Sequence, residues 1–342
     1  MKRILLILFF VMPQAWASHR DDYQTIDEHA RNAPASVTGS IEKLANYLVR
    51  PATNDVEKVR SFYVWIAENI SYDVQAFLKG ILKQYSPEEV LQKRKAVCQG
   101  YSGLFKALCE EVGIRCELIP GYSKGYGYVP KKSFTNSDHA WNAVYLNNEW
   151  HLLDVTWGAG GINEKQKFVK EFNEDYFLTD PATFVLKHMP LDPMWQLLDC
   201  PVSIQDFVKG DEAVAAALKN GKKCMNYKKA IADFEKLSTP EQELQSAKNA
   251  YAFNPDNPVA LATAYVNYAY YLTKDVKQQL TSKQEILDAI QLQEETLTYL
   301  KTAEDLLKKS NDPNAQGLKG VVQQNIANGE RNLKAMKEVV SR

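Results

Sequence analysis

The sequence predicts an α+β domain followed by an all-α domain, and three observations point to this fold class. Apolar residues recur at helical spacing over residues 41–70 and 98–113. The period then changes to two over residues 115–157, which is typical of strands. Past Pro201 nearly every segment is helical again. A helical layer before a small antiparallel sheet is an α+β arrangement, and a chain of 342 residues is long enough for two domains.

Residues 1–17 have the layout of a cleavable secretory signal. A basic pair precedes an apolar run from Ile4 to Met12, and an A-W-A pattern ends at Ala17, where we expect cleavage. A buried N-terminal segment or an uncleaved anchor is the alternative, although the run is too short to span a bilayer. From this signal pattern we expect a secreted or periplasmic protein. Because no later segment is long and apolar enough to cross a membrane, we expect no transmembrane segment after cleavage.

The first domain is predicted to span residues 41–202. Residues 18–40 carry few large apolar side chains, and we expect them to be an extended lead-in. Two helices follow, separated by a loop that begins at Pro51, and a third begins near Cys98 and is closed by Gly113. Residues 172–200 carry too many aromatic side chains for an exposed linker, so we expect them to cover this domain.

Three strands are predicted after these helices, at residues 115–122, 139–146 and 149–157. Asn147 and Asn148 stand between the last two, and paired asparagines suit a two-residue turn with positive φ. With this turn Trp141 faces Asp154 across the hairpin. Because side chains alternate along a strand, His139 and Asp154 become diagonal neighbours on one face. An imidazole and a carboxylate can bridge such a gap.

A loop is predicted before the second of these strands. Residues 123–138 are rich in Gly, Ser and Lys, and this composition is typical of a mobile, exposed segment. Loops of this kind commonly surround binding sites. Since the loop leads directly to His139, we expect it to lie beside the candidate site.

The types and positions of Cys98, His139 and Asp154 fit a nucleophilic triad. Aspartate can hold one tautomer of an imidazole and stabilise its protonated form. At the N-terminus of a helix, backbone N–H groups and the helix dipole favour a thiolate and can also hold an oxyanion. Taken alone, a cysteine is more often a packing residue, and His151, on the opposite face of the hairpin, is expected to be structural. Only the joint pattern favours catalysis.

Cysteine usage leaves the choice between disulfide and free thiol open. The chain has five cysteines, so an exported form keeps at least one unpaired. None stands in a C-x-x-C pair, and no histidine is spaced to complete a zinc pattern. We therefore expect no metal and no cofactor. The cysteines are Cys98, Cys109, Cys116, Cys200 and Cys224.

The charge balance argues against a nucleic-acid partner. The chain has 41 Lys and Arg against 42 Asp and Glu, and no long run of one sign. A near-zero net charge without a basic segment provides no whole-molecule field for a polyanion.

Residues 203–342, called the helical tail from here on, are predicted to be an all-α domain. Asn257 and Pro258 have the types preferred at a helix N-cap and first turn. Some segments look like tetratricopeptide-type hairpins, but no fixed period is present. A bundle that covers the first domain and a peptide-binding solenoid both fit, so the tail is a candidate surface for a protein partner. Its helices are expected near 211–221, 226–237, 240–253, 257–274, 284–309 and 315–339.

Five motifs follow one another along the chain: "KVRSFYVWIAENISYD", "KAVCQGYSGLFKALCEEVGI", "GYSKGYG", "HAWNAVYLNNEWHLLDVTWG" and "DYFLTDPATFVLKHMPLDPMWQLL". In this order they resemble the motifs of the transglutaminase-like superfamily, and the last two are similar in particular to its kyphoscoliosis-peptidase branch. The resemblance covers about residues 41–200 and implies a papain-like fold in which Cys98, His139 and Asp154 are catalytic. As candidates for holding the oxyanion or the substrate we take Tyr72, Gln99 and Trp141.

The resemblance does not by itself fix the reaction, because transglutaminase-like domains include crosslinkers, peptidases, amidases and adaptors that have lost the cysteine. We expect an exported cysteine peptidase or amidase that forms a thioacyl-enzyme on Cys98 and acts on a protein, a peptide or a cell-wall peptide. Two alternatives stay open: transfer of the acyl group to an amine, as in protein crosslinking, and a non-catalytic adaptor with a vestigial triad. The sequence shows no calcium-binding loop, so metal dependence is not expected.

Overall fold

Two compact units make up the computed structural model of the chain. It describes residues 23–80, 85–134, 136–221, 223–276, 279–310 and 313–341, so the predicted signal lies outside the described residues. The first unit comprises the chain up to Leu118 together with Trp141–Leu178, and the second comprises Ile119–Ala140 and Thr179–Arg342. The domain join near residue 203 coincides with none of these boundaries and stays a prediction.

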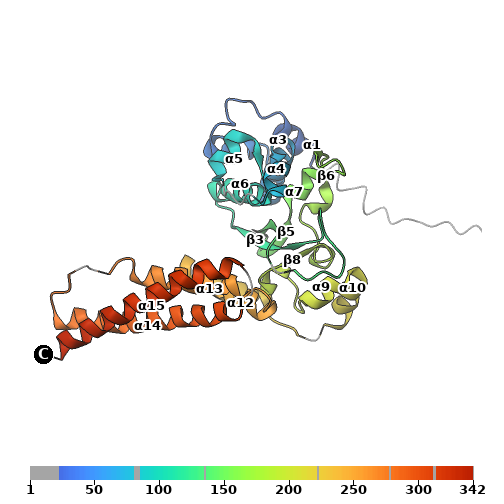
Figure 1. The fold of residues 1–342 in the computed structure, drawn as a ribbon. Helices are drawn as coiled ribbons and strands as arrows, with labels where there is room; N and C mark the ends of the chain where they lie inside the picture. The colour runs from blue at the N-terminus through green and yellow to red at the C-terminus, as the bar shows by residue number, and fades with distance from the viewer. Residues whose placement is uncertain are drawn as a thin grey trace, which may run out of the picture. The chain divides into compact units, whose positions relative to one another are not determined.

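Helices packed around one hydrophobic core make up most of the first unit (Figure 1). The two helices expected before Cys98 are confirmed as α2 and α3, and a third begins at Cys98 itself. Asn54 caps α3, because its side-chain oxygen accepts a hydrogen bond from the Glu57 N–H at 3.0 Å. The helices are α1 (Gln24–Arg31), α2 (Ile41–Leu48), α3 (Asp55–Asn69), α4 (Val74–Leu78), α5 (Pro87–Lys93), α6 (Cys98–Glu111), α7 (Val155–Gly158) and the short η2 (Glu174–Tyr176).

The expectation of an extended lead-in over residues 18–40 is wrong for its described part, because α1 is a helix that packs on α3. Its Ile26 is buried, and its Asp27 carboxylate accepts two hydrogen bonds from the buried Arg60, from Nε at 2.7 Å and from Nη2 at 2.6 Å. Such a bidentate pair fixes the orientation of a short helix. The partner lies 33 residues away in sequence, so no local pattern indicated it.

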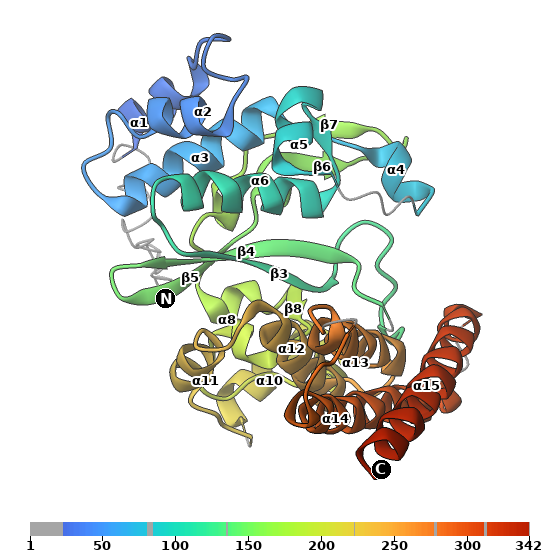
Figure 2. The ribbon, with the colours of Figure 1, turned by 90° about the vertical axis from the view of Figure 1, so that its left-hand side faces the viewer.

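A four-stranded sheet has the order β5-β4-β3-β8. Its strands are β3 (Cys116–Ser123), β4 (His139–Leu146), β5 (Glu149–Leu153) and β8 (His188–Pro190). Figure 2 shows α3 and α6 along one face of β4 and β5. The predicted two-residue turn is confirmed, since Asn147 and Asn148 have φ of 51° and 66°. The β4–β5 register runs from Asn142 opposite Leu153 to Leu146 opposite Glu149, as the turn requires.

Two small sheets complete the first unit. β1 (Ser71–Tyr72) pairs in parallel with β2 (Lys95–Ala96), and β6 (Gly160–Ile162) forms a hairpin with β7 (Phe168–Lys170). Lys170, at the end of that hairpin, donates hydrogen bonds from Nζ to three carbonyls at the end of α3, those of Ala67, Glu68 and Ile70. A cation at this position satisfies carbonyl groups that have no partner within the helix.

In the second unit, a hydrophobic cluster joins the strands to α9 (Ile204–Lys209) and α10 (Asp211–Asn220). Its fully buried members include Tyr122 of β3, Met189 of β8 and Phe207 of α9. The short elements α8 (Pro181–Phe184) and η3 (Pro193–Gln196) flank β8.

The aromatic residues of the segment 172–200 divide between the two units. Phe172 and Phe177 pack on the core of the first unit, as expected. Phe184 and Trp195 are also buried, but they belong to the second unit. Because the predicted first domain includes part of that unit, their covering of the first domain stays a prediction.

The helical tail is confirmed as a set of packed helices, and three long ones lie side by side in Figure 1: α13, α14 and α15. Asn257 and Pro258 occupy the expected N-cap and first-turn positions of α13. The tail buries a core of its own, which includes Leu261, Ala303 and Val322. Its later helices are α11 (Tyr227–Phe234), α12 (Thr239–Phe253), α13 (Pro258–Thr273), α14 (Lys283–Lys308) and α15 (Pro313–Val340).

The predicted fold class is confirmed by these elements: helices and a small antiparallel sheet come first, and a helical region follows. Within the described ranges, every helix is too short or too polar to cross a membrane.

Candidate functional site

Cys98 is the first residue of α6, and the parallel pair β1–β2 determines what lies beside it. Tyr72 of β1 is paired with Ala96 of β2, two residues before Cys98. Val97, which precedes the helix, has no polar side chain with which to cap the first N–H groups of α6. The side chain of Cys98 is half-buried. The predicted position at a helix N-terminus is therefore confirmed.

Close packing around the start of α6 depends on Gly100. A Cβ at this position would lie 2.6 Å from the Ala96 Cβ and 3.0 Å from Val90 Cγ2. The absence of a side chain lets the first turn of α6 approach β2 and α5. The buried Tyr101 adds a second link, since its hydroxyl donates to the Ile70 carbonyl at 2.8 Å.

Tyr72 lies against the start of α6. Burial raises its pKa well above the usual range, and the negative charges that Cys98 and Asp154 carry when ionised raise it further. A hydrogen bond from the Cys98 backbone N–H to the Tyr72 hydroxyl acts in the opposite direction. The hydroxyl consequently keeps its proton near neutral pH and can donate it to an anion formed near Cys98.

Asp154 is completely buried at the point where β5 ends. Its Oδ1 accepts hydrogen bonds from the N–H groups of Thr156 at 2.8 Å and Trp157 at 3.1 Å, so it is the N-cap of α7. The predicted strand over residues 149–157 is thus too long, because the chain turns into a helix after Leu153. This capping fixes the carboxylate in one orientation.

Tyrosines of the first unit surround Asp154. Burial raises the pKa of Tyr63 and of Tyr176, and the charge of Asp154 adds to both effects. The Asp154 N–H donates to the Tyr176 carbonyl at 2.9 Å. Gly158 of α7 allows the closest approach, because a Cβ there would lie 2.0 Å from the Tyr63 hydroxyl oxygen.

His139 begins β4, in the part of that strand that belongs to the second unit. It is buried, and its ring centroid is 5.5 Å from that of His188 on β8. A ring nitrogen of each histidine lies within 4.8 Å of one of the other. His188 stacks on Phe184, with ring centroids 4.1 Å apart. His188 was not predicted from the sequence, although it stands in the last of the five motifs, in "KHMP".

The remaining candidates differ in how much of their surface a substrate could reach. Gln99 is half-buried, next to Cys98 on α6. Trp141 is completely buried, which fits packing better than contact with a substrate. His151, which we expected to be structural, pairs with Val144 and is half-buried.

The cysteines divide into a disulfide and three free thiols. Cys200 and Cys224 are bonded to each other. Cys109 and Cys116 are free and buried, and burial raises the pKa of Cys109, as does its hydrogen bond with Cys116. A buried thiol with a raised pKa is a poor nucleophile. Of the three free cysteines, Cys98 is the one that is not buried.

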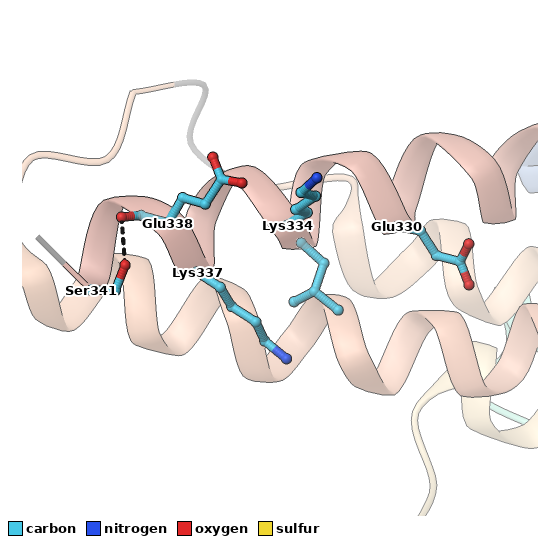
Figure 3. Close-up of a pocket in the computed structure, with 6 residues that line it drawn as sticks. Glu330, Lys334, Lys337, Glu338 and Ser341 are labelled. Carbon is cyan, nitrogen blue, oxygen red and sulfur yellow. Dashed lines mark hydrogen bonds between the residues drawn. The ribbon is translucent and has the colours of Figure 1, made fainter.

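A pocket on the tail involves none of these candidates. It lies along α15, where Figure 3 shows Glu330, Lys334 and Lys337 together with Glu338 and Ser341. Charged side chains of both signs and the apolar Leu333 line it. Because neither cysteine nor histidine is among these lining residues, the pocket does not provide the groups of the predicted triad.

A match to a known family covers the first part of the chain. Residues 42–155 match the family model of the transglutaminase-like superfamily. The matched range includes Cys98, His139 and Asp154.

Among curated relatives, the chain is similar to kyphoscoliosis peptidase of Mus musculus, with 41% identity over 54% of this chain and 28% of that protein. It is 31% identical to Hillarin of Drosophila melanogaster, over 54% of this chain and 24% of that protein. It is 32% identical to the Lim and transglutaminase domain protein ltd-1 of Caenorhabditis elegans, over 55% of this chain and 27% of that protein. The chain therefore spans about a quarter of the length of these relatives.

Proposed function

We propose that this protein is a cysteine-dependent acyl-transfer enzyme that hydrolyses an amide bond through a thioacyl-enzyme on Cys98. His139 is the base and Asp154 orients it. Three features of the first unit support the proposal: the half-buried thiol at the start of α6, the protonated Tyr72 hydroxyl beside it, and the fixed carboxylate of Asp154. The name of kyphoscoliosis peptidase, the relative from mouse, supports hydrolysis of a peptide.

The observation that carries the assignment of His139 is the register of β4 and β5. Continued by one pair beyond Asn142 and Leu153, this register sets Trp141 opposite Asp154, and His139 stands two residues before Trp141 on the same strand. Residues two apart on a strand share a face. The register therefore supports a pairing of the His139 imidazole with the Asp154 carboxylate.

In the first half of the reaction the Cys98 thiolate attacks the amide carbonyl carbon, and a C–S bond forms while the carbonyl oxygen becomes an oxyanion. The Tyr72 hydroxyl donates a hydrogen bond to that oxyanion. The His139 imidazolium then gives its proton to the leaving nitrogen, and the C–N bond breaks. The products of this half are an amine and the thioacyl-enzyme.

In the second half, neutral His139 takes a proton from water, and the resulting hydroxide attacks the thioester carbon. The C–S bond breaks, and the thiolate and the His139 imidazolium are restored. Asp154 stabilises the imidazolium in both halves. An amine that replaces water at this point would give acyl transfer, so the nature of the acceptor decides between hydrolysis and crosslinking.

Alkylation of the thiols tests the proposal. We expect iodoacetamide near pH 6 to modify Cys98 in the native protein much faster than Cys109 or Cys116, as mapped by mass spectrometry. Equal labelling of Cys98 and Cys109 would refute the nucleophile assignment and favour an adaptor. A screen of peptides and cell-wall peptides with an added amine then separates hydrolysis from amine transfer by the products formed.

Export to the periplasm or the medium is part of the proposal. The pattern that ends at Ala17 supports it, and so does the Cys200–Cys224 disulfide, because disulfides persist mainly in oxidising compartments. N-terminal sequencing of the protein recovered from its host is the test. A mature chain that begins at Ser18 is expected, and an intact Met1 in a reducing compartment would contradict export.

A further inference from the structure

One buried amide of the helical tail contacts the segment that leads to His139. Asn254 follows the last residue of α12 and is 5% exposed. Its Nδ2 donates to the Tyr122 hydroxyl at 2.9 Å and to the Phe134 carbonyl at 3.0 Å. Both acceptors are distant in sequence, so these bonds are long-range contacts within the second unit.

The first acceptor belongs to β3 and the second to residues 124–134, called the 124–134 loop from here on. The Phe134 ring centroid lies 5.1 Å from that of Tyr122 and 5.6 Å from that of Phe207 on α9. This loop, which its composition predicted to be mobile, is therefore held at its far end by an aromatic cluster and by the Asn254 amide.

Its link to His139 runs through the two neighbours of Tyr122. The Gly121 carbonyl accepts hydrogen bonds from the Asp138 N–H at 3.1 Å and from the Ser137 hydroxyl at 3.0 Å. The Ser123 N–H donates to the Asp138 carboxylate at 2.8 Å. Asp138 directly precedes His139. Residues 121–123 of β3 are thus hydrogen-bonded both to Asn254 of the tail and to Asp138, the residue before β4.

We propose that Asn254 is a positioning residue: it clamps the 124–134 loop onto β3 and in this way fixes the start of β4 and the orientation of His139. The inference rests on the proposed function of His139. It assigns to the tail a part in assembling the site, although all the candidate catalytic residues lie upstream of the tail. The clamp consists of neutral groups, since the donor is an amide and the acceptors are a hydroxyl and a carbonyl.

A purely structural role for Asn254 is the competing explanation. Its Oδ1 also accepts a hydrogen bond from the Asp256 N–H at 3.4 Å, in the turn between α12 and α13. If this were its whole contribution, replacement would lower the stability of the tail and leave the 124–134 loop unchanged. The two explanations differ in what happens at Lys131 and Lys132, which are exposed on that loop and are sites for trypsin.

The test uses the full chain with Asn254→Ala and Asn254→Asp, the latter keeping an acceptor but losing the donor. Asn249→Ala is the matched control, because Asn249 is another tail amide, on α12, and donates at 2.8 Å to Asp192, which is not part of the loop. Three quantities are measured: the melting temperature, the rate of trypsin cleavage after Lys131 and Lys132 in the native protein, and the rate of Cys98 alkylation.

We expect both Asn254 variants to be cleaved about tenfold faster in the loop, as loss of one or two buried hydrogen bonds predicts. In both Asn254 variants Cys98 alkylation should also slow several-fold. Asn249→Ala should change neither the cleavage rate nor the alkylation rate, even if it lowers the melting temperature as much as the Asn254 variants do. Unchanged cleavage in folded Asn254→Ala, or equal acceleration in Asn249→Ala, would overturn the clamp.

Faster cleavage at an unchanged rate of Cys98 alkylation would overturn the link to His139. The proposed function fails in a distinguishable way. If the unaltered protein has no fast-reacting thiol, both the proposed function and the link from Asn254 to His139 are refuted. The rate of trypsin cleavage alone then decides whether Asn254 holds the 124–134 loop.

Discussion

Adding a single methyl group at Gly158, close to Asp154, should lower the stability of the first unit strongly. In Gly158→Ala the new Cβ would lie 2.0 Å from the Tyr63 hydroxyl oxygen and 2.4 Å from Tyr63 Cζ, far inside van der Waals contact. Tyr63 is completely buried, and its hydroxyl donates to the Asn173 carbonyl at 2.6 Å. The ring can therefore move away only by disturbing its neighbours and breaking this hydrogen bond.

The expected cost has two parts. Overpacking of a dense core by one methyl group costs about 1–3 kcal/mol of unfolding free energy. Displacing the Tyr63 hydroxyl from the Asn173 carbonyl leaves buried polar groups unsatisfied, which costs about 1–3 kcal/mol more. Full additivity would give a loss of about 2–6 kcal/mol. We expect a value in the lower half of this range, because a movement of Tyr63 that breaks the hydrogen bond also relieves part of the overpacking.

The measurement is equilibrium unfolding in urea, followed by the fluorescence of the tryptophans. Gly161→Ala is the control, because nothing lies within 4 Å of a Cβ at Gly161, a short distance further along the chain. Tyr63→Phe in the Gly158→Ala background should recover part of the loss, since it removes the atom in closest contact. A Gly158→Ala protein as stable as Gly161→Ala would refute the packing described for α7.

The other predictions concern charge. Burial raises the pKa of Asp192 from 3.8 to about 6, so folding favours its protonated form. The stability that this provides is fully present below pH 3.8 and is lost as the pH rises through about 6. Asp192→Asn should flatten this pH dependence of the unfolding free energy over the same range. Asp27→Asn leaves the buried Arg60 charge without its main partner and should cost about 3–5 kcal/mol in urea unfolding, whereas no measurable loss would mean that Arg60 is solvated. His139→Ala should slow Cys98 alkylation near pH 6 by about tenfold or more, because an imidazolium stabilises the thiolate, and His151→Ala should leave the rate nearly unchanged; the reverse result would transfer the role of base to His151.

Local features of this chain could be predicted from sequence because their causes are local. The paired asparagines set the turn between β4 and β5, and the turn sets the register. The start of α6 at Cys98 follows from the apolar period after it. The resemblance of motifs was decisive for the particular fold, since periodicity alone does not distinguish one α+β fold from another.

The features that could not be predicted depend on partners distant in the chain. The helix α1 is stabilised by Arg60, and the end of β5 is decided by the capping geometry of Asp154. Phe184 and Trp195 are buried as expected but in the second unit. Aromatic content predicts burial without indicating which core receives the side chain. His188 could not be predicted as a neighbour of His139, because the two histidines lie on strands that are distant in sequence.

The Cys200–Cys224 disulfide joins residues separated by 24 positions, and the loop that it closes contains α9 and α10. Closing such a loop removes conformational freedom mainly from the unfolded chain and contributes about 3.5 kcal/mol in the simple entropic model. Phe207 and Val214, inside this loop, belong to the hydrophobic cluster that also contains Tyr122. Reduction of one covalent bond would therefore make unfolding entropically easier for the elements that support β3. The protein should be more readily denatured by heat in the presence of a thiol reductant, even though none of its free cysteines is affected.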